Sequence, residues 1–253
     1  MQLLVDTGNS SIKWALRRGA GQPLTGFGAA LHGGALPLDL LAVWDELDRI
    51  DAVLAAGVGP QSVRDAVAQV SRARFGIAPR WLHTRAEACG MRIAYADPAQ
   101  LGVDRFLALI AAHRRAQAAA QPMSTLIVDA GTAVTFDALL ADGRHLGGLI
   151  LPGIRMQRES LLAGTQIPRH EPTDANLPWA VDTGQAIAAA SIQAPAALLE
   201  RLHHRLAAHA GAAPKLILTG GDAERLAAAC DLPAELAPEL VPELVLEGLA
   251  AFA

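Results

Sequence analysis

One pattern of apolar and polar positions occurs twice along the chain. An apolar run ends in Asp-Thr-Gly at residues 6–8, and a second apolar run ends in Asp-Ala-Gly at residues 129–131. A further short apolar run follows each glycine. Glycine lets a chain reverse and lets its backbone approach a ligand closely. We therefore expect each copy to form a strand, a tight turn and a second strand.

After each copy of this pattern, segments with helical spacing of apolar residues alternate with short unbroken apolar runs. Apolar residues three and four apart favour a helix with one buried face, and unbroken apolar runs favour buried strands. The sequence predicts helices over residues 38–50, 103–115, 181–209 and 241–252, a helix opened by Gly59-Pro60, strands over residues 52–56 and 215–218, and a hairpin turn at Asp142-Gly143.

A stretch rich in alanine and glutamine, residues 116–122, separates the two copies. We therefore expect an N-terminal domain over residues 1–118 and a C-terminal domain over residues 123–253, both of the α/β class. Clefts between domains are preferred ligand sites, so a central cleft is the expected place for chemistry. The alternative is that two Asp-x-Gly turns arose by chance in one mixed α/β chain.

Composition narrows the choice of partners. The 253 residues are 52% hydrophobic and carry a net charge of −4, which does not suggest a nucleic-acid surface. No apolar stretch approaches the ~20 residues of a membrane span, and the N-terminus lacks a basic signal-peptide region. We expect a soluble cytoplasmic protein without nucleic-acid or membrane partners. Cys89 and Cys230 are too few for a disulfide framework, and we expect buried or half-buried thiols.

The first turn has the groups that phosphoryl transfer requires: donors for phosphate oxygens and a positive charge. Lys13 supplies the charge, and it is one of only two lysines, the other being Lys215. Asp6 is a hard oxygen ligand suited to Mg²⁺, and we expect it to bind the ion through water because Mg²⁺ keeps part of its hydration shell. A plain turn is the alternative. The candidate phosphate-binding residues are Asp6, Thr7, Gly8, Asn9, Ser10, Ser11, Ile12 and Lys13.

Further polar residues suggest roles in the same chemistry. Thr132 follows the second turn and can donate to a phosphate, and Asp129 can help to hold a cation. Asp104 and Arg105 begin a predicted helix, where a charged carboxylate could accept a proton from an alcohol; a first-turn salt bridge is the alternative. Tyr95, the only tyrosine, lies shortly before them. Asp137 reads as an ordinary surface carboxylate.

Glycine-rich strand ends complete the set of motifs. They occur at residues 147–153 and 219–222, where the backbone could pass close to an adenine or a ribose, or where tight packing alone could require glycine. The eight histidines show no metal-binding spacing, and we expect surface or packing roles for them.

Together these motifs resemble those of type III pantothenate kinases. The matching blocks, in order, are residues 6–13, 102–105, 129–137, 147–153, 183–187 and 219–221, so the resemblance covers nearly the whole chain. It implies the duplicated, ribonuclease-H-like fold of the actin and hexokinase superfamily. It also implies ATP-dependent phosphorylation of pantothenate to 4'-phosphopantothenate, the first step of coenzyme A biosynthesis.

The resemblance also implies residue roles. Asp104 becomes the proton acceptor, Asp129 the ligand of a monovalent cation (K⁺ or NH₄⁺), and the turn at residues 6–13 with Thr132 the ATP contacts. It further implies Mg²⁺ and a homodimer. The implied pantothenate contacts are Tyr95, Gly102, Val103, Asp104, Arg105 and Thr183.

The chain departs from the family pattern at one strand end. It has Gly57-Val58-Gly59-Pro60 where the family commonly has Ser-Val-x-Pro, so any polar contact of that serine is in doubt. Two other functions stay open. One is another small-molecule kinase of the superfamily, such as an acetate or sugar kinase; the other is a non-catalytic regulatory relative.

Overall fold

The computed structural model describes residues 1–168, 177–233 and 236–253, and they form two compact units. Unit 1 comprises Met1–Arg114 and Glu243–Ala253, and unit 2 comprises Arg115–Pro242. The expected division at residues 118–123 differs from this in two respects: the first half ends a few residues earlier, at Arg114, and the C-terminal segment packs with the first half of the chain. Within the described ranges, no helix is both long and apolar enough to cross a bilayer.

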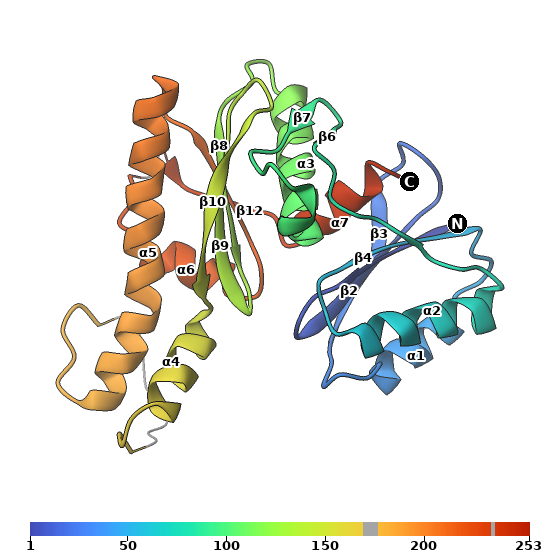
Figure 1. Cartoon of the computed structure of the whole chain (residues 1–253), viewed down its shortest axis with the longest axis horizontal. Helices are drawn as coiled ribbons and strands as arrows, with labels where there is room; N and C mark the ends of the chain where they lie inside the picture. Colours follow the sequence, from blue (N-terminus) through green and yellow to red (C-terminus); the bar gives the residue numbers. More distant parts are fainter. Residues whose placement is uncertain (169–176, 234–235) are drawn as a thin grey trace. The chain divides into compact units, whose positions relative to one another are not determined.

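Unit 1 is built on a five-stranded sheet with the order β3-β2-β1-β4-β5. β1 pairs antiparallel with β2 and parallel with β4, so the chain crosses over between β3 and β4 (Figure 1). The strands are β1 (Gln2–Thr7), β2 (Ser11–Arg17), β3 (Leu24–Leu31), β4 (Ala52–Gly57) and β5 (Arg80–Trp81).

Two helices cover one face of this sheet, α1 (Leu38–Asp45) and α2 (Gln61–Phe75). Alternate residues of the strands point towards them and form a core with Trp44 and Val63 at its centre. The period of two along a strand sends the intervening residues, including Asp6 and Lys13, to the opposite face. The carboxylate of Asp6, the candidate Mg²⁺ ligand, therefore lies on the face away from α1 and α2.

The C-terminal helix α7 (Leu244–Ala250) packs against β1, β2 and β4 in unit 1. Arg17 holds it there: its guanidinium donates to the carbonyls of Ala250 at 2.9 Å and Ala253 at 2.8 Å. Burial lowers the pKa of Arg17, and nearby Arg114 lowers it further. At Gly248 an added Cβ would lie 2.0 Å from the Leu107 carbonyl oxygen, so α7 also sits tightly on α3 (Val103–Ala118).

Unit 2 repeats the same sheet. Its strand order is β10-β9-β8-β11-β12, which matches unit 1 strand for strand. The remaining short elements belong to unit 1: a hairpin of β6 (Glu87–Ala88) and β7 (Met91–Arg92), and a 3₁₀ turn, Pro98–Gln100. The strands of unit 2 are β8 (Thr125–Ala130), β9 (Ala133–Leu139), β10 (His145–Pro152), β11 (Lys215–Thr219) and β12 (Glu239–Leu240).

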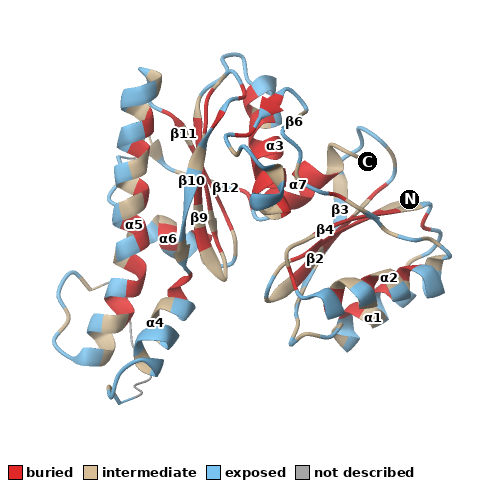
Figure 2. Ribbon diagram, viewed as in Figure 1, coloured by how far each residue is buried: buried red, intermediate tan, exposed pale blue. Residues whose placement is uncertain are grey.

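Helices α5 (Thr183–Ala210) and α6 (Ala223–Ala229) cover one face of the second sheet. The buried side of α5 faces that sheet and its outer side is exposed (Figure 2). A further helix, α4 (Ile154–Ala163), follows β10. As in unit 1, the strand residues that alternate with the core, including Asp129, point to the face without α5 and α6.

The duplicated α/β fold expected from the sequence is confirmed, and most predicted elements are present. The predicted helix at residues 38–50 ends early, at Asp45. The strand β3 and the helix α4 had no counterpart among the predictions.

Cys89 contradicts the expectation of a buried or half-buried thiol, because it occupies the exposed turn of the β6–β7 hairpin with a φ of 51°. Cys230 is half-buried, and burial, followed by nearby Glu200, raises its pKa to about 12.

Candidate active site

The first Asp-x-Gly turn joins β1 to β2. The Gly8 N–H donates to the Ser11 carbonyl at 2.9 Å and closes the turn. Asp6 is the second-last residue of β1, is 8% exposed, and lies directly opposite Lys13 in the antiparallel register. Residues directly opposite in such a pair project from the same face, so the carboxylate and the ammonium lie on one side of the sheet beside the turn.

A histidine that the sequence did not single out supports this turn. His32 follows β3, its backbone N–H donates to the Ser10 carbonyl at 2.9 Å, and its Nε2 lies 2.9 Å from the Gly8 carbonyl oxygen. Its Nδ1 accepts from the Gly34 N–H at 3.3 Å, so the proton belongs on Nε2, which then donates to Gly8. No local sequence signal marks this contact, because it joins two strands across 24 residues.

The end of β4 packs against the same turn. The N–H groups of Val58 and Gly59 both donate to the Thr7 carbonyl, at 3.1 and 3.0 Å. An added Cβ on Gly59 would lie 2.3 Å from the Gly8 carbonyl oxygen, so only glycine permits this approach.

The departure from the family pattern at residue 57 has a physical explanation here. An added Cβ on Gly57 would lie 1.7 Å from Oγ1 of Thr7, and that hydroxyl donates to the Ala56 carbonyl at 3.2 Å. The Thr7 side chain therefore fills the space that a serine at position 57 would need.

Asp104 occupies the first turn of α3, as the sequence predicts. Its Oδ1 accepts from the backbone N–H of Arg105 at 2.8 Å. The same oxygen would lie 2.5 Å from a Cβ on Gly102, so a larger residue there would displace the carboxylate from the start of the helix. The carboxylate is half-buried and sits at a helix N-terminus, where the exposed N–H groups stabilise its charged form.

Tyr95 and Arg105 lie together beside Asp104. The Arg105 guanidinium donates to the Tyr95 hydroxyl at 3.2 Å and stacks 5.8 Å from the centre of its ring. Arg105 is 7% exposed and Tyr95 is half-buried. Val58 links this group to the first turn, because its side chain would contact a Cβ on Gly102 at 3.5 Å. Unit 1 thus places both the Asp6 turn and the start of α3, which carries Asp104, next to the end of β4.

The second Asp-x-Gly turn, in unit 2, has the same construction. The Gly131 N–H donates to the Ala133 carbonyl at 2.9 Å, and the Gly153 N–H donates to the Thr132 carbonyl at 2.9 Å. Gly220 follows β11 with a φ of +93°, and a Cβ there would lie 2.5 Å from Oδ1 of Asp129. The backbone directly after β11 therefore passes close to the carboxylate expected to bind a cation.

Two other residues of unit 2 need separate comment. Thr183 is the exposed first residue of α5, and Asp182 caps that helix by accepting from the Gln185 N–H at 2.8 Å. The interpretation of Asp137 as a surface carboxylate is wrong. It is 2% exposed and lies 3.0 Å from Nε2 of His145, itself 4% exposed. Asp137 pairs with Ile127 on the same face of the sheet as Asp129 and is buried there.

The described residues contain no group of three or more His, Cys, Asp or Glu side chains suited to a metal ion. Each Asp-x-Gly turn instead offers a single carboxylate beside closely approaching backbone. Such a donor set fits a cation that is shared with phosphate oxygens and water, as Mg²⁺ commonly is. It does not fit an all-protein metal cage.

A family model described as type III pantothenate kinase matches residues 2–205. The chain belongs to the type III pantothenate kinase family. A type III pantothenate kinase of Nitrosococcus oceani is 38% identical over 230 residues, covering 89% of this chain and 85% of that protein. Another, of Aromatoleum aromaticum, is 38% identical over 255 residues, covering 100% of this chain and 98% of that protein.

Solved structures resemble this member of the family in fold. A Baf family transcriptional activator from Campylobacter jejuni covers 98% of the chain with a TM-score of 0.59 and 21% identity. The activator of 2-hydroxyisocaproyl-CoA dehydratase from Clostridium difficile, with bound ADPNP, covers 100% of it with a TM-score of 0.52 and 13% identity. At these identities the likeness concerns the actin-like fold alone.

Proposed function

We propose that this protein phosphorylates pantothenate with ATP to give 4'-phosphopantothenate, the first step of coenzyme A biosynthesis. The family match over residues 2–205 carries the proposal. The protein is thus a kinase with an alcohol acceptor. Its candidate residues fit this chemistry in type, because phosphoryl transfer needs positioning, charge neutralisation and a proton acceptor.

The acceptor site is proposed to involve Tyr95 and residues 102–105, which we call the acceptor segment. In this proposal Arg105 and Tyr95 bind pantothenate, together with the backbone of Gly102 and Val103 and the hydroxyl of Thr183 in unit 2. A buried guanidinium that already stacks on an aromatic ring loses little conformational freedom when it binds an anionic substrate.

The reaction is proposed to proceed by direct transfer. The primary hydroxyl oxygen of pantothenate attacks the γ-phosphorus of ATP, the bond to the β,γ-bridging oxygen breaks, and ADP leaves. The hydroxyl proton passes to the Asp104 carboxylate. The helix N-terminus keeps that carboxylate charged before the reaction, as a proton acceptor requires.

The two turns are proposed to bind the nucleotide and its cations. The turn at residues 6–13 and Thr132 would contact the phosphates, and Lys13 would neutralise part of their charge. Asp6 would hold Mg²⁺ through water, and Asp129 a monovalent cation, K⁺ or NH₄⁺. When bound, these ions would neutralise the charge that repels an anionic carboxylate from the phosphates.

We further propose a cytoplasmic homodimer, as the family resemblance implies. The competing assignment is a different small-molecule kinase of the same superfamily, or a regulatory relative without activity. The paired Tyr95 and Arg105 favour pantothenate, because an acetate or sugar kinase of the superfamily is expected to lack the segment from Tyr95 to Arg105 at this spacing.

A coupled ADP-release assay tests the proposal. Purified protein with MgATP should release ADP in the presence of pantothenate and should not do so with acetate or glucose. Replacing sodium by potassium at fixed ionic strength should raise the rate. Activity with acetate or a sugar but not with pantothenate would disprove the substrate assignment, and equal rates in the two salts would disprove the cation.

A further inference from the structure

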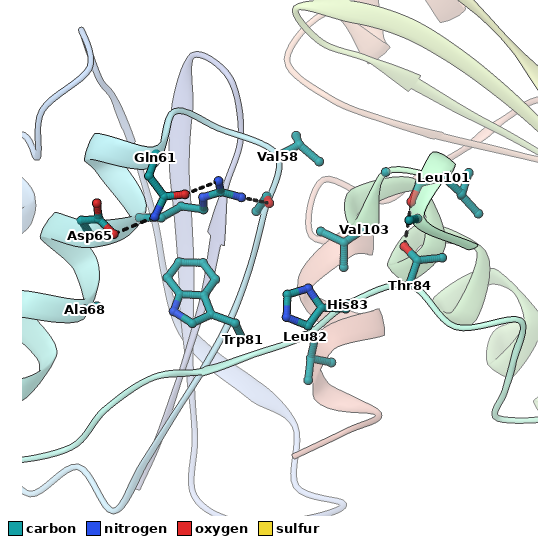
Figure 3. Close-up of a pocket in the computed structure, with 14 residues that line it drawn as sticks. Val58, Gln61, Asp65, Ala68, Trp81, Leu82, His83, Thr84, Leu101 and Val103 are labelled. Atoms are coloured by element: carbon teal, nitrogen blue, oxygen red, sulfur yellow. Dashed lines mark hydrogen bonds between the residues drawn. The ribbon is translucent and has the colours of Figure 1, made fainter. Parts of the chain in front are cut away.

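A pocket of about 750 Å³ lies in unit 1 beside the acceptor segment (Figure 3). It is bounded by the end of β4, the first turns of α2, the stretch from β5 to Thr84, and residues 99–103. Its volume lies within the range of about 300–1,000 Å³ that is typical of small-molecule sites. The residues of α2 and β5 that line this pocket have no part in the kinase reaction proposed above.

The pocket contains one cation that is not neutralised by a carboxylate. Arg64 of α2 donates to the Gln61 side-chain oxygen at 2.5 Å and weakly to the Gly57 carbonyl at 3.4 Å, both neutral acceptors. Its Nε is buried and has no hydrogen-bond partner among the described residues. A buried donor without a partner is costly, so an anion that reached this edge of the guanidinium would be stabilised.

The remaining walls are suited to an apolar body. The indole of Trp81 lies between α2 and His83, and the side chains of Val58 and Val103 stand across from it (Figure 3). Thr84 is held by its hydrogen bond to the Leu101 carbonyl at 2.7 Å. An indole face next to aliphatic side chains favours a flat or aliphatic group over a small inorganic anion.

One acidic group also lines the pocket, and it limits the affinity for anions. Asp65 accepts from the Gln61 amide at 2.7 Å and is exposed on the α2 side. Its charge is screened by solvent, whereas the Nε of Arg64 is buried. Substitution of Asp65 therefore gives a control with a predictable sign.

We propose that this pocket is an accessory site for a small organic carboxylate with an apolar body. The carboxylate binds Arg64, and the apolar body packs between Trp81 and Val103. The site is separate from the pantothenate site, although Gly102 and Val103 border both. This inference does not depend on the proposed kinase activity, because it rests on the walls of the pocket.

Cyclohexanecarboxylate and its neutral amide, cyclohexanecarboxamide, are suitable probes because neither absorbs where tryptophan does. The change in Trp81 fluorescence on titration should saturate with the acid, and the amide should bind at least about tenfold more weakly, since it lacks the charge-assisted contacts. Calorimetric titration of Trp81→Phe, which removes the fluorescent reporter, should still detect the acid.

Three variants and one competitor complete the test. Arg64→Gln should lose about tenfold or more in affinity for the acid and little for the amide, whereas Asp65→Asn should bind the acid slightly more tightly. Asp104→Asn should bind it unchanged, whether or not the protein is a pantothenate kinase. Equal binding of acid and amide by the wild-type protein would overturn the proposal without any variant. Displacement of the acid by pantothenate would also overturn it, because the two ligands would then share one site.

Discussion

The two halves of the chain place an Asp-x-Gly turn at the same position of the same type of sheet, but the two turns differ in length and in the residues around the aspartate. In unit 1, Thr7 pairs with Ile12, so four residues, 8–11, form the turn. In unit 2, Ala130 pairs with Val134, so three residues, 131–133, form it. The longer turn adds one more backbone N–H and hydroxyl side chains, which supports its proposed role in binding the phosphates of ATP.

The residues opposite the two carboxylates differ as well. Asp6 stands across from Lys13, whereas the equivalent Asp129 stands across from Thr135. The first turn therefore carries a fixed positive charge from the protein, and the second presents a carboxylate and a hydroxyl, both oxygen donors. These differences are consistent with the roles proposed above, phosphate binding for the first turn and cation binding for the second.

The largest effect that separates the halves is expected at Asp104 of unit 1, the proposed proton acceptor. Asp104→Asn is nearly isosteric and cannot accept a proton, so kcat should fall by about 10²–10⁴-fold. Asp97→Asn is the matched control: Asp97 caps the adjacent 3₁₀ turn and should leave kcat nearly unchanged. Steady-state rates with both variants check this, and a fully active Asp104→Asn would remove that carboxylate from the mechanism.

The second prediction distinguishes the two turns by the ion on which each aspartate variant changes the dependence of the rate. Asp129→Asn should abolish the difference between potassium and sodium, whereas Asp6→Asn should keep that difference and require more Mg²⁺. Each should also lower kcat/KM for ATP by about 10–100-fold, as expected for loss of one or two interactions with a charged group. Rates measured over a matrix of Mg²⁺ and potassium concentrations distinguish them. If both variants lost the same ion response, the division of roles between the halves would be wrong.

The third prediction concerns two equivalent glycines. Gly57 is the last residue of β4 and pairs with Thr7. Gly220 occupies the equivalent place in unit 2: it follows Thr219, which pairs with Asp129, and it packs on Ala130. Gly57→Ser should lower the free energy of unfolding by about 1–3 kcal/mol through overpacking against the Thr7 side chain. Adding Thr7→Ala should recover most of this loss.

Gly220→Ala is the contrasting variant, because its Cβ would clash with backbone atoms of Ala130 as well as with Oδ1 of Asp129, and its φ is +93°. No side-chain substitution removes the backbone clash or the positive φ, so the loss of stability should not be recoverable. Denaturant unfolding of the four proteins gives the free energies. A Gly57→Ser protein as stable as wild type would show that Thr7 does not fill the serine's place.

The smallest effect is expected at the edges of the two sheets. In unit 1, Arg80 of β5 donates to the Phe252 carbonyl; in unit 2, Glu239 of β12 pairs with Lys215 and Arg115. Burial alone would raise the pKa of Glu239, but the hydrogen bonds from Lys215 and Arg115 outweigh it and lower that pKa. The folded-state pKa is below the unfolded one, so the stabilisation is present above the unfolded pKa and is lost as pH falls through the folded pKa.

Glu239→Gln should therefore reduce stability at neutral pH and have less effect in acid. Because the Glu239 side chain is 31% exposed, screening limits the loss to about 1 kcal/mol or less. Urea unfolding at neutral and acidic pH measures it. A loss that grew as the pH was lowered would contradict the sign of the shift.

The repeat made most of this fold predictable from sequence. The strand-turn-strand pattern is local, and its second occurrence gave the duplicated architecture. β3 was missed because its glycines weaken the strand pattern, yet Gly28 is needed there: a Cβ would lie 2.1 Å from the Trp14 ring. The place of α7 in unit 1 depends on the contact of Arg17 with Ala250, 233 residues away, which no local pattern can show.

The local structure around Asp6, Asp104 and Asp129 was predictable, because two of them precede the glycine of a strand-turn-strand pattern and the third begins a helix. The supporting contacts were not. His32 reaches Gly8 and Val58 reaches Gly102 only after the strands have paired, and Asp137 was placed on the surface because its neighbours in sequence do not reveal His145 across the hairpin.

Identification of the reaction product tests the central claim most directly. Wild-type protein incubated with pantothenate, MgATP and potassium should convert pantothenate to a species heavier by one phosphoryl group, with one ADP formed for each, as read by mass spectrometry. Fragmentation should place the group on the primary hydroxyl, and Asp104→Asn should form almost none. Release of ADP with no phosphorylated pantothenate would contradict the account.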